Sequence, residues 1–265
     1  MYRSLLLIIN YKTLIITFLS LVATYYCDYF KFTGDLPLTL VGTAIIFPIV
    51  FSINSAYKRR EDALMNYASI KSNLFGIFMA SKNWLSNDKY NFAEQILEVE
   101  LEFMHELKAF FAQNPLKPIK ATKIYQCFNQ ISSIIQSFRK ENLSPTELSR
   151  TDQYLTRAIS DFEKMKKILL YRTPNSLRTY SKFFTYTFPV LYAPYFAFHL
   201  NDGKDLLIGY FSAVMYSFVF VSLINIQEQL ENPFDQFGED DIRFDVEEFK
   251  NMIRNCGDFE SELLD

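Results

Sequence analysis

Glycine, cysteine and histidine are scarce in this sequence, and each scarcity argues against a class of protein. The 7 glycines form no phosphate-binding loop, and no GxSxG or HExxH motif is present, so we expect no enzyme. The 3 cysteines, Cys27, Cys127 and Cys256, lie far apart, which favours isolated thiols over a disulfide framework or a zinc site. The 2 histidines, His105 and His199, have no nucleophile or metal ligand nearby in the sequence.

Charged residues are absent from some segments and dense in others. The formal net charge is only -3, which argues against a nucleic-acid partner. Long uncharged runs flank a middle region with lysine and glutamate at nearly every helical turn. A chain divided in this way faces two solvents, lipid and water. We therefore expect an all-α integral membrane protein in contact with the lipid bilayer.

Four apolar runs could each cross the hydrocarbon core of a bilayer, which is about 30 Å thick. They cover residues 11–30, 36–53, 183–200 and 206–226. The first run is the weakest, because it contains Lys12, whose side chain would have to extend back to the interface. A secretory signal peptide is the alternative for this run. However, no small-residue cleavage site follows it, and Tyr25, Tyr26 and Tyr29 are typical of an interfacial aromatic belt.

The distribution of basic residues predicts the orientation of these runs. Basic residues occupy positions 58–60 after the second run, and five more precede the third, at Lys166, Lys167, Arg172, Arg178 and Lys182. The two short connecting loops carry mixed charges. The positive-inside rule therefore places the middle region and both termini in the cytoplasm of a multi-pass cell-membrane protein.

The middle region predicts long amphipathic cytoplasmic helices. Apolar residues recur at intervals of three and four, as in Phe92, Ile96, Val99, Phe103, Leu107 and Phe110. We expect such stripes to be core or subunit-contact faces, and Glu98 and Glu102 to lie on a solvated face. Ser144 and Glu147 form a capping box that predicts a helix start at Pro145. The expected divisions are 1–56 (two spans), 57–174 (cytoplasmic helices), 175–226 (two spans) and 227–265 (an acidic cytoplasmic segment).

The four runs contain none of the buried charges that ion-coupled transporters place at the bilayer midplane. A pore closed by a hydrophobic constriction needs no such charge. Four helices cannot enclose a wet pore and also bury their remaining surface, so a channel would require a ring of subunits. From the sequence alone, no charged ring indicates the sign of the conducted ion.

Two motifs carry a family resemblance. The segment Glu228–Phe234 reads EQLENPF and is followed closely by GEDD at 238–241. At the end of the second run, Phe51, Asn54, Tyr57 and Arg59 fit an F-x-x-N-x-x-Y-x-R pattern. Both resemble bestrophins, which form pentameric chloride-permeable channels, and the resemblance covers essentially the whole chain. Arg60 and Glu61 depart from the family, which usually has tryptophans there.

The resemblance implies two constrictions. In the family, the second span lines a narrow neck with apolar side chains one helical turn apart. The corresponding positions here are Thr43, Phe47 and Phe51, with Leu40 a candidate if the register shifts; packing against neighbouring spans is the alternative. A lower aperture precedes the third span of the family. Thr173-Pro174 matches its start, and Asn175 or Leu177 would take the place of its apolar residue.

The resemblance also implies a possible calcium site. The family's calcium clasp combines the acidic turn with a backbone carbonyl near the N-terminus. Its side chains correspond to Gln229, Asn232 and Asp240, and Asp241 or Asp245 would replace the last acidic ligand. Calcium prefers six or more oxygen ligands, which such a turn could offer. The alternative is a solvated acidic turn that caps a helix.

The expected function is therefore a homopentameric channel for small monovalent ions, with chloride or other anions favoured. A non-conducting helical membrane scaffold, or a cation-selective channel of the same fold, is the alternative. Only the channel hypotheses require a continuous axial path lined by the second span.

Overall fold

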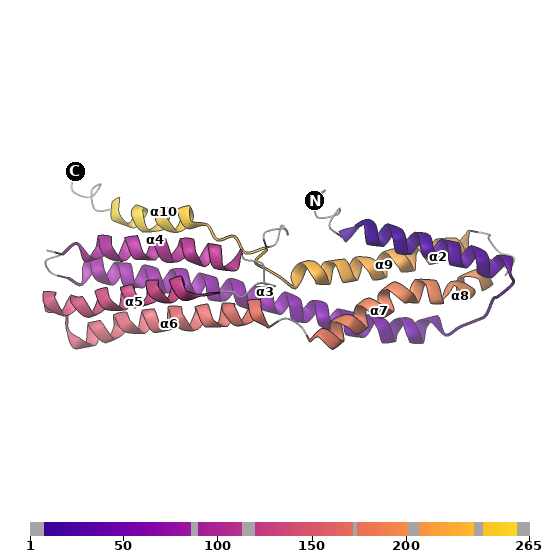
Figure 1. The fold of residues 1–265 in the computed structure, drawn as a ribbon, viewed down its shortest axis with the longest axis horizontal. Coiled ribbons are helices and arrows are strands. Elements are labelled where there is room, and N and C mark those ends of the chain that lie inside the picture. The colour runs from indigo at the N-terminus through magenta and orange to yellow at the C-terminus, as the bar shows by residue number, and fades with distance from the viewer. Residues whose placement is uncertain are drawn as a thin grey trace. The chain divides into compact units, whose positions relative to one another are not determined.

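The structure is a computed structural model that describes residues 8–85, 90–112, 120–171, 174–200, 207–235 and 241–258, without the side chains of 175 and 256–258. Every element in these ranges is a helix, which confirms the all-α prediction (Figure 1). In chain order the helices are α2 (Tyr11–Tyr29), α3 (Leu38–Asn83), α4 (Phe92–Phe111), α5 (Thr122–Ser137), the 3-10 helix η1 (Phe138–Glu141), α6 (Pro145–Leu170), α7 (Asn175–Leu191), α8 (Ala193–Phe198), α9 (Ile208–Leu230) and α10 (Val246–Asp258).

The chain forms two compact units, each assembled from two separate parts of the sequence. Unit 1 comprises Met1–Arg60 and Arg172–Asn232, and unit 2 comprises Glu61–Tyr171 and Pro233–Asp265. Two helices in the described ranges, α3 and α9, have the length and apolar composition needed to cross a membrane. The third predicted run does not form one long helix, because the chain breaks at Tyr192, between α7 and α8, just before Pro194.

Helix α3 is longer than the sequence analysis expected. It has 46 residues and contributes to both units, whereas the predicted second run ended at Ile53. The charged residues from Lys58 to Asp62 do not end the helix, because no glycine or proline accompanies them and all except Asp62 have a good helix propensity. A change in polarity along the sequence therefore marks no change in secondary structure here.

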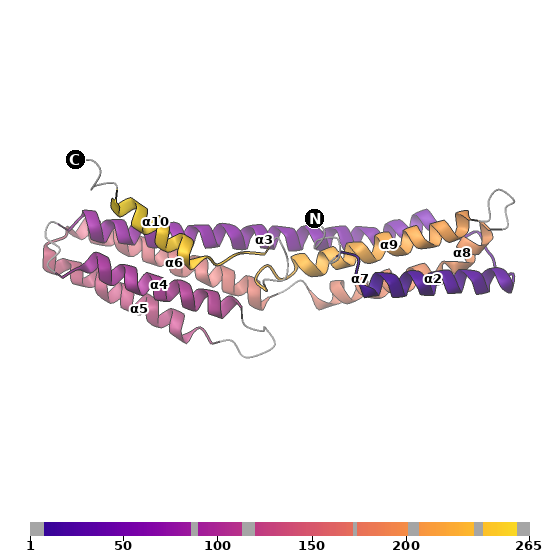
Figure 2. The same ribbon diagram turned by 90° about the horizontal axis from the view of Figure 1, so that it is seen from above.

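Unit 1 is a bundle of α2, α7, α8, α9 and the first part of α3 (Figure 2). Asn10 caps α2 by accepting hydrogen bonds from the backbone N–H groups of Lys12 and Thr13. The Ser20 hydroxyl donates to the Pro189 carbonyl oxygen at 2.9 Å, which ties α2 to α7. The first predicted run is therefore packed as part of unit 1.

The apolar core of unit 1 lies between α3, α7, α8 and α9. Its buried members are Ile45, Ile49, Phe188, Tyr192, Phe196, Ala213, Phe220 and Ile224. Helices α8 and α9 approach closely at Gly209, where a Cβ atom would lie 2.3 Å from the carbonyl oxygen of Phe196. Only glycine fits this position without a shift of the backbone.

Unit 2 buries the predicted amphipathic stripes in a single core. The stripe of α4 is buried except for a partly exposed Val99, while Glu98 and Glu102 are exposed, as expected for a solvated face. The capping box at the start of α6 is confirmed: the Ser144 hydroxyl accepts from the Glu147 N–H, and the Glu147 carboxylate accepts from the Ser144 N–H, both at 3.3 Å.

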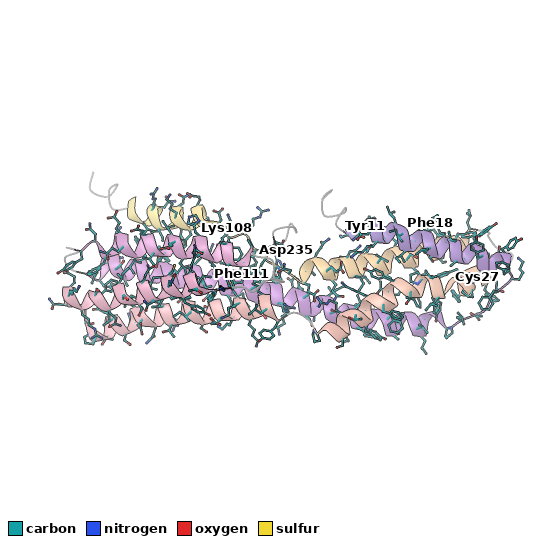
Figure 3. The ribbon with its side chains drawn as sticks, in the orientation of Figure 1. Tyr11, Phe18, Cys27, Lys108, Phe111 and Asp235 are labelled. Atoms are coloured by element: carbon teal, nitrogen blue, oxygen red, sulfur yellow. The ribbon has the colours of Figure 1, made fainter. Side chains whose placement is uncertain are left out.

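The chain after Pro233 also packs into the core of unit 2. Phe234 is completely buried, and its ring centroid lies 4.5 Å from that of Phe111 of α4. Phe244 stacks on Phe111 at 5.4 Å and makes an edge contact with Tyr67 of α3 at 5.0 Å. In Figure 3, Phe111 is directed into the unit, whereas Lys108 lies at its surface. Phe234 and Phe244 thus anchor the C-terminal segment in unit 2.

Candidate functional site

One face of α3 in unit 1 is apolar and exposed. It carries the predicted neck residues: Leu40 is 71% exposed, Phe47 is 58% exposed and Phe51 is 62% exposed. The opposite face is buried in the core of the unit through Ile45, Ile49 and Ala56. Within the described part of the chain, this face of α3 has no partner, which is typical of a surface that contacts lipid or another protein.

Local contacts make this face more apolar than its sequence suggests. The hydroxyl of Thr43 donates to the Thr39 carbonyl oxygen at 2.6 Å, one turn back on the same helix. Because this bond occupies the Thr43 hydroxyl, mainly the apolar methyl group of Thr43 is left to contact its surroundings. The rings of Phe47 and Phe51 stack at a centroid distance of 6.2 Å. Pro48 lies within α3 without interrupting it.

The predicted aperture lies at the start of α7. Thr173 is outside the described residues, Pro174 precedes the helix, and Asn175 is its first residue. The side chain of Asn175 is not described, and Leu177 is half-buried. Neither residue is placed against the neck by the structure of unit 1, so the aperture stays a prediction.

The predicted calcium ligands are divided between the two units. Gln229 and Asn232 belong to unit 1, Asp241 and Asp245 belong to unit 2, and Asp240 lies outside the described residues. The Asp245 carboxylate already accepts the Glu248 N–H at 2.9 Å at the start of α10. No cluster of three histidine, cysteine or acidic residues suited to a metal ion occurs in the described part of the chain. Because Asp240 lies outside the described residues and the other candidate ligands belong to both units, the calcium site stays a prediction.

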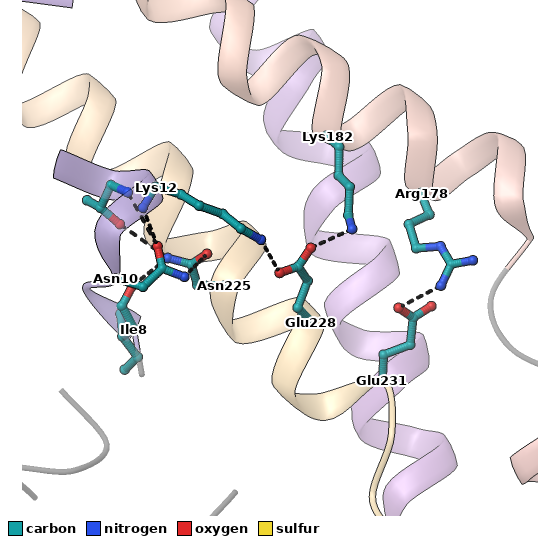
Figure 4. A network of polar contacts seen from close by, with 9 residues as sticks. Ile8, Asn10, Lys12, Arg178, Lys182, Asn225, Glu228 and Glu231 are labelled. Atoms are coloured by element: carbon teal, nitrogen blue, oxygen red, sulfur yellow. Dashed lines mark hydrogen bonds and ion pairs between the residues drawn. The ribbon is translucent and has the colours of Figure 1, made fainter. Parts of the chain in front are cut away.

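A cluster of ion pairs joins three helices of unit 1 at Glu228 (Figure 4). Glu228 of α9 lies between two lysines: the Lys12 ammonium group is 3.0 Å from its Oε2 atom, and Lys182 of α7 pairs with its Oε1 atom. The three side chains are between 28% and 38% exposed. Lys12 is therefore paired within the protein and does not simply extend to an interface.

Two further contacts extend the cluster on either side of Glu228. Arg178 of α7 contacts the largely buried carboxylate of Glu231 at 3.2 Å. The amide group of Asn225 donates to the Ile8 carbonyl oxygen at 2.6 Å and to the Thr13 hydroxyl at 3.2 Å. The C-terminal part of α9 thereby holds both the start of α2 and the start of α7.

This cluster was not predicted from the sequence, although the spacing of its residues contains a signal. Asn225, Glu228 and Glu231 follow one another at intervals of three and lie on one face of α9. Arg178 and Lys182 are four residues apart on α7 and carry the opposite charge. The partners are far apart in the sequence, however, and only the fold shows that they meet.

Comparison with known proteins identifies the fold. No family model matches the sequence, and no curated protein matches it. A crystal structure described as that of a membrane protein matches with a TM-score of 0.76 and 18% sequence identity. The match covers 92% of this chain and 95% of that one, and it indicates the fold of a helical membrane protein.

More specifically, a mutant bestrophin homologue from Klebsiella pneumoniae matches with a TM-score of 0.76 and 17% identity over 92% of this chain and 96% of its own. A second crystal structure of a Klebsiella pneumoniae bestrophin homologue gives 0.74 at 17% identity, with 92% and 95% coverage. The chain therefore has the fold of the bacterial bestrophin homologues, as its two sequence motifs indicated.

Proposed function

We propose that this chain is the subunit of a homopentameric ion channel in the cell membrane, with α3 lining the pore. The exposed apolar face of α3 carries this proposal. In a ring of subunits, that face would form a neck through Leu40, Thr43, Phe47 and Phe51. Such a neck would control ion passage by dewetting and would need no charged residue at the constriction.

The surface of unit 1 fits a location in lipid. Large apolar side chains are exposed along α2, including Tyr11 and Phe18, which point outward in Figure 3. Others are exposed along α9, including Phe211 and Met215. Exposed apolar residues on several helices at once are unusual for a protein in water. The proposed topology has four spans, namely α2, the first part of α3, α7 with α8, and α9, and both termini lie in the cytoplasm.

Chloride or another small anion is the proposed permeant ion. Bestrophins form chloride-permeable channels, and the fold of this chain is that of bestrophin homologues. The neck itself carries no charge that would exclude anions. Conduction also fits the absence of acidic and basic residues from the apolar part of α3, because a midplane charge would indicate coupled transport.

Ion flux through the purified protein in liposomes tests the proposal. We expect chloride to move down its gradient in vesicles that contain the protein but not in empty vesicles, with potassium gradients tested separately. Mass measurement in mild detergent should give five subunits. A stable one- or two-subunit particle without flux would refute the channel and leave the non-conducting scaffold as the function.

A further inference from the structure

The exposed face of α3 does not end at the apolar neck. Lys58 follows Phe51 by seven residues, which is close to two helical turns, so both side chains project from nearly the same side of the helix. The rise between them is about 10 Å. Lys58 is exposed, like Leu40, Phe47 and Phe51 before it. It is the first residue on this face that is charged at neutral pH.

The other charged residues near Lys58 are less exposed. Arg59 and Arg60 are partly buried, are turned away from this face by the 100° step of the helix, and make contacts of their own. Glu61 and Asp62 come three and four residues later and are also only partly exposed. The charge nearest the apolar neck, and the one most available to an ion, is therefore the Lys58 ammonium group.

We propose that Lys58 determines the ion preference of the channel by placing a ring of ammonium groups at the cytoplasmic end of the neck. This inference rests on the proposed function, because copies of Lys58 converge only if α3 faces the axis of a ring. Rings of basic side chains favour anions in a pore by attracting them and repelling cations. The low-dielectric wall formed by Phe51 and Phe47 strengthens that field. The flexible four-carbon stem of lysine lets the ammonium group reach into the path of the ion.

The ring acts where the carboxylates of Glu61 and Asp62 have less influence. They lie about one turn farther from the neck, roughly 5 Å along the helix. This extra distance is shorter than the screening length of about 10 Å in 0.1 M salt, so the carboxylates also act on the ion, but from farther away. At the cytoplasmic end of the neck, an ion is therefore closer to the Lys58 ammonium group than to either carboxylate.

Reversal potentials in planar bilayers with a tenfold KCl gradient test this inference. We expect the wild type to prefer chloride to potassium, and Lys58→Arg to keep that preference. Lys58→Gln should lower the chloride-to-potassium permeability ratio by roughly threefold to tenfold, since about 1.4 kcal/mol corresponds to a factor of ten. Lys58→Glu should shift the preference to cations. Lys108→Gln, which removes the charge of an exposed lysine on α4, should leave the ratio unchanged.

A second measurement needs no variant. Because screening weakens the field of exposed charges, the preference of the wild type should decline as the salt concentration rises from 0.05 M to 1 M on both sides. The inference is overturned, and the channel function is retained, if the wild type conducts but prefers cations. The same holds if Lys58→Gln and Lys58→Glu both keep the wild-type chloride-to-potassium permeability ratio. Absence of conduction by the wild type would instead overturn the proposed function together with this inference.

Discussion

At the scale of single residues, Glu100 is the least expected feature of the structure. It lies on the buried face of α4 and is fully inaccessible to solvent, and neither carboxyl oxygen has a hydrogen-bond partner in the described part of the chain. Burial raises the pKa of Glu100 well above its ordinary value of 4.5. The sequence analysis did not single it out, because its neighbours Glu98 and Glu102 lie on the exposed face of the same helix.

The raised pKa of Glu100 predicts a pH-dependent stability. The folded state keeps a proton on Glu100 at pH values where the unfolded chain has released it, so the free energy of unfolding falls as the pH rises above about 4.5. The glutamine of Glu100→Gln cannot ionise, so this variant should lose the pH dependence. Its free energy of unfolding should exceed that of the wild type by about 1–3 kcal/mol at pH 8. Thermal unfolding in detergent between pH 5 and pH 8 measures the effect. The exposed Glu98→Gln should follow the wild type, and equal slopes for the wild type and Glu100→Gln would contradict the prediction.

Substitution by alanine should have opposite effects on stability at two glycines of unit 1, Gly209 and Gly42. At Gly209, the new methyl group would meet the Phe196 carbonyl oxygen at 2.3 Å and the Leu200 side chain at 2.8 Å, so Gly209→Ala should lower stability by about 1–3 kcal/mol. At Gly42, apart from the adjoining residues and the backbone of α3 itself, no atom of the described residues lies within 4 Å of the new methyl group. Because alanine favours a helix over glycine by about 1 kcal/mol, Gly42→Ala should keep or raise the Tm of the subunit. Similar losses of stability in both variants would show that the close packing of α8 on α9 does not cause the effect of Gly209→Ala.

At the scale of the helices, Glu228 joins three elements of unit 1, since Lys12 belongs to α2, Lys182 to α7 and Glu228 itself to α9. Glu228→Gln leaves two partly buried ammonium groups without their shared anion and should lower the free energy of unfolding by about 1–3 kcal/mol. Lys31→Gln is the control, because the Lys31 side chain is 72% exposed and the loss of its pair with Asp28 should cost less than about 0.5 kcal/mol. Comparison of the Tm values of the two variants decides whether the cluster stabilises the bundle.

The helices also show what the sequence predicts well and what it does not. The stripe of α4 and the capping box of α6 depend on residues a few positions apart, and both were located correctly. The continuation of α3 past the second run to Asn83 was not predicted, because the charged residues from Lys58 to Asp62 change the polarity of α3 without interrupting the helix. The ion pairs of Glu228 depend on partners more than 40 positions away, so no local pattern contains them.

At the scale of the whole molecule, the bestrophin fold could be predicted from two short motifs, whereas the candidate site could be predicted only in part. The neck residues were assigned from the family resemblance and stay a prediction, and the structure adds that the face of α3 that carries them is exposed. The calcium site stays a prediction, because its candidate ligands belong to two units and Asp240 lies outside the described residues. Spacing along the chain does not show where a unit ends.

The last prediction concerns which exposed apolar face lines the pore. Phe47 of α3 is 58% exposed and Phe18 of α2 is 66% exposed, so the two side chains are matched in kind and in accessibility within the subunit. In the proposed ring, Phe47 narrows the neck, whereas Phe18 faces lipid. Truncation of a neck residue widens the pore and reduces the apolar surface that favours dewetting. Phe47→Ala should therefore raise single-channel conductance or open probability, and Phe18→Ala should leave both at wild-type values. Planar-bilayer recordings, with the pentameric mass of each variant checked in detergent, distinguish the two. If Phe18→Ala changes conductance and Phe47→Ala does not, α3 is a lipid-facing helix and the pore lies elsewhere in the assembly.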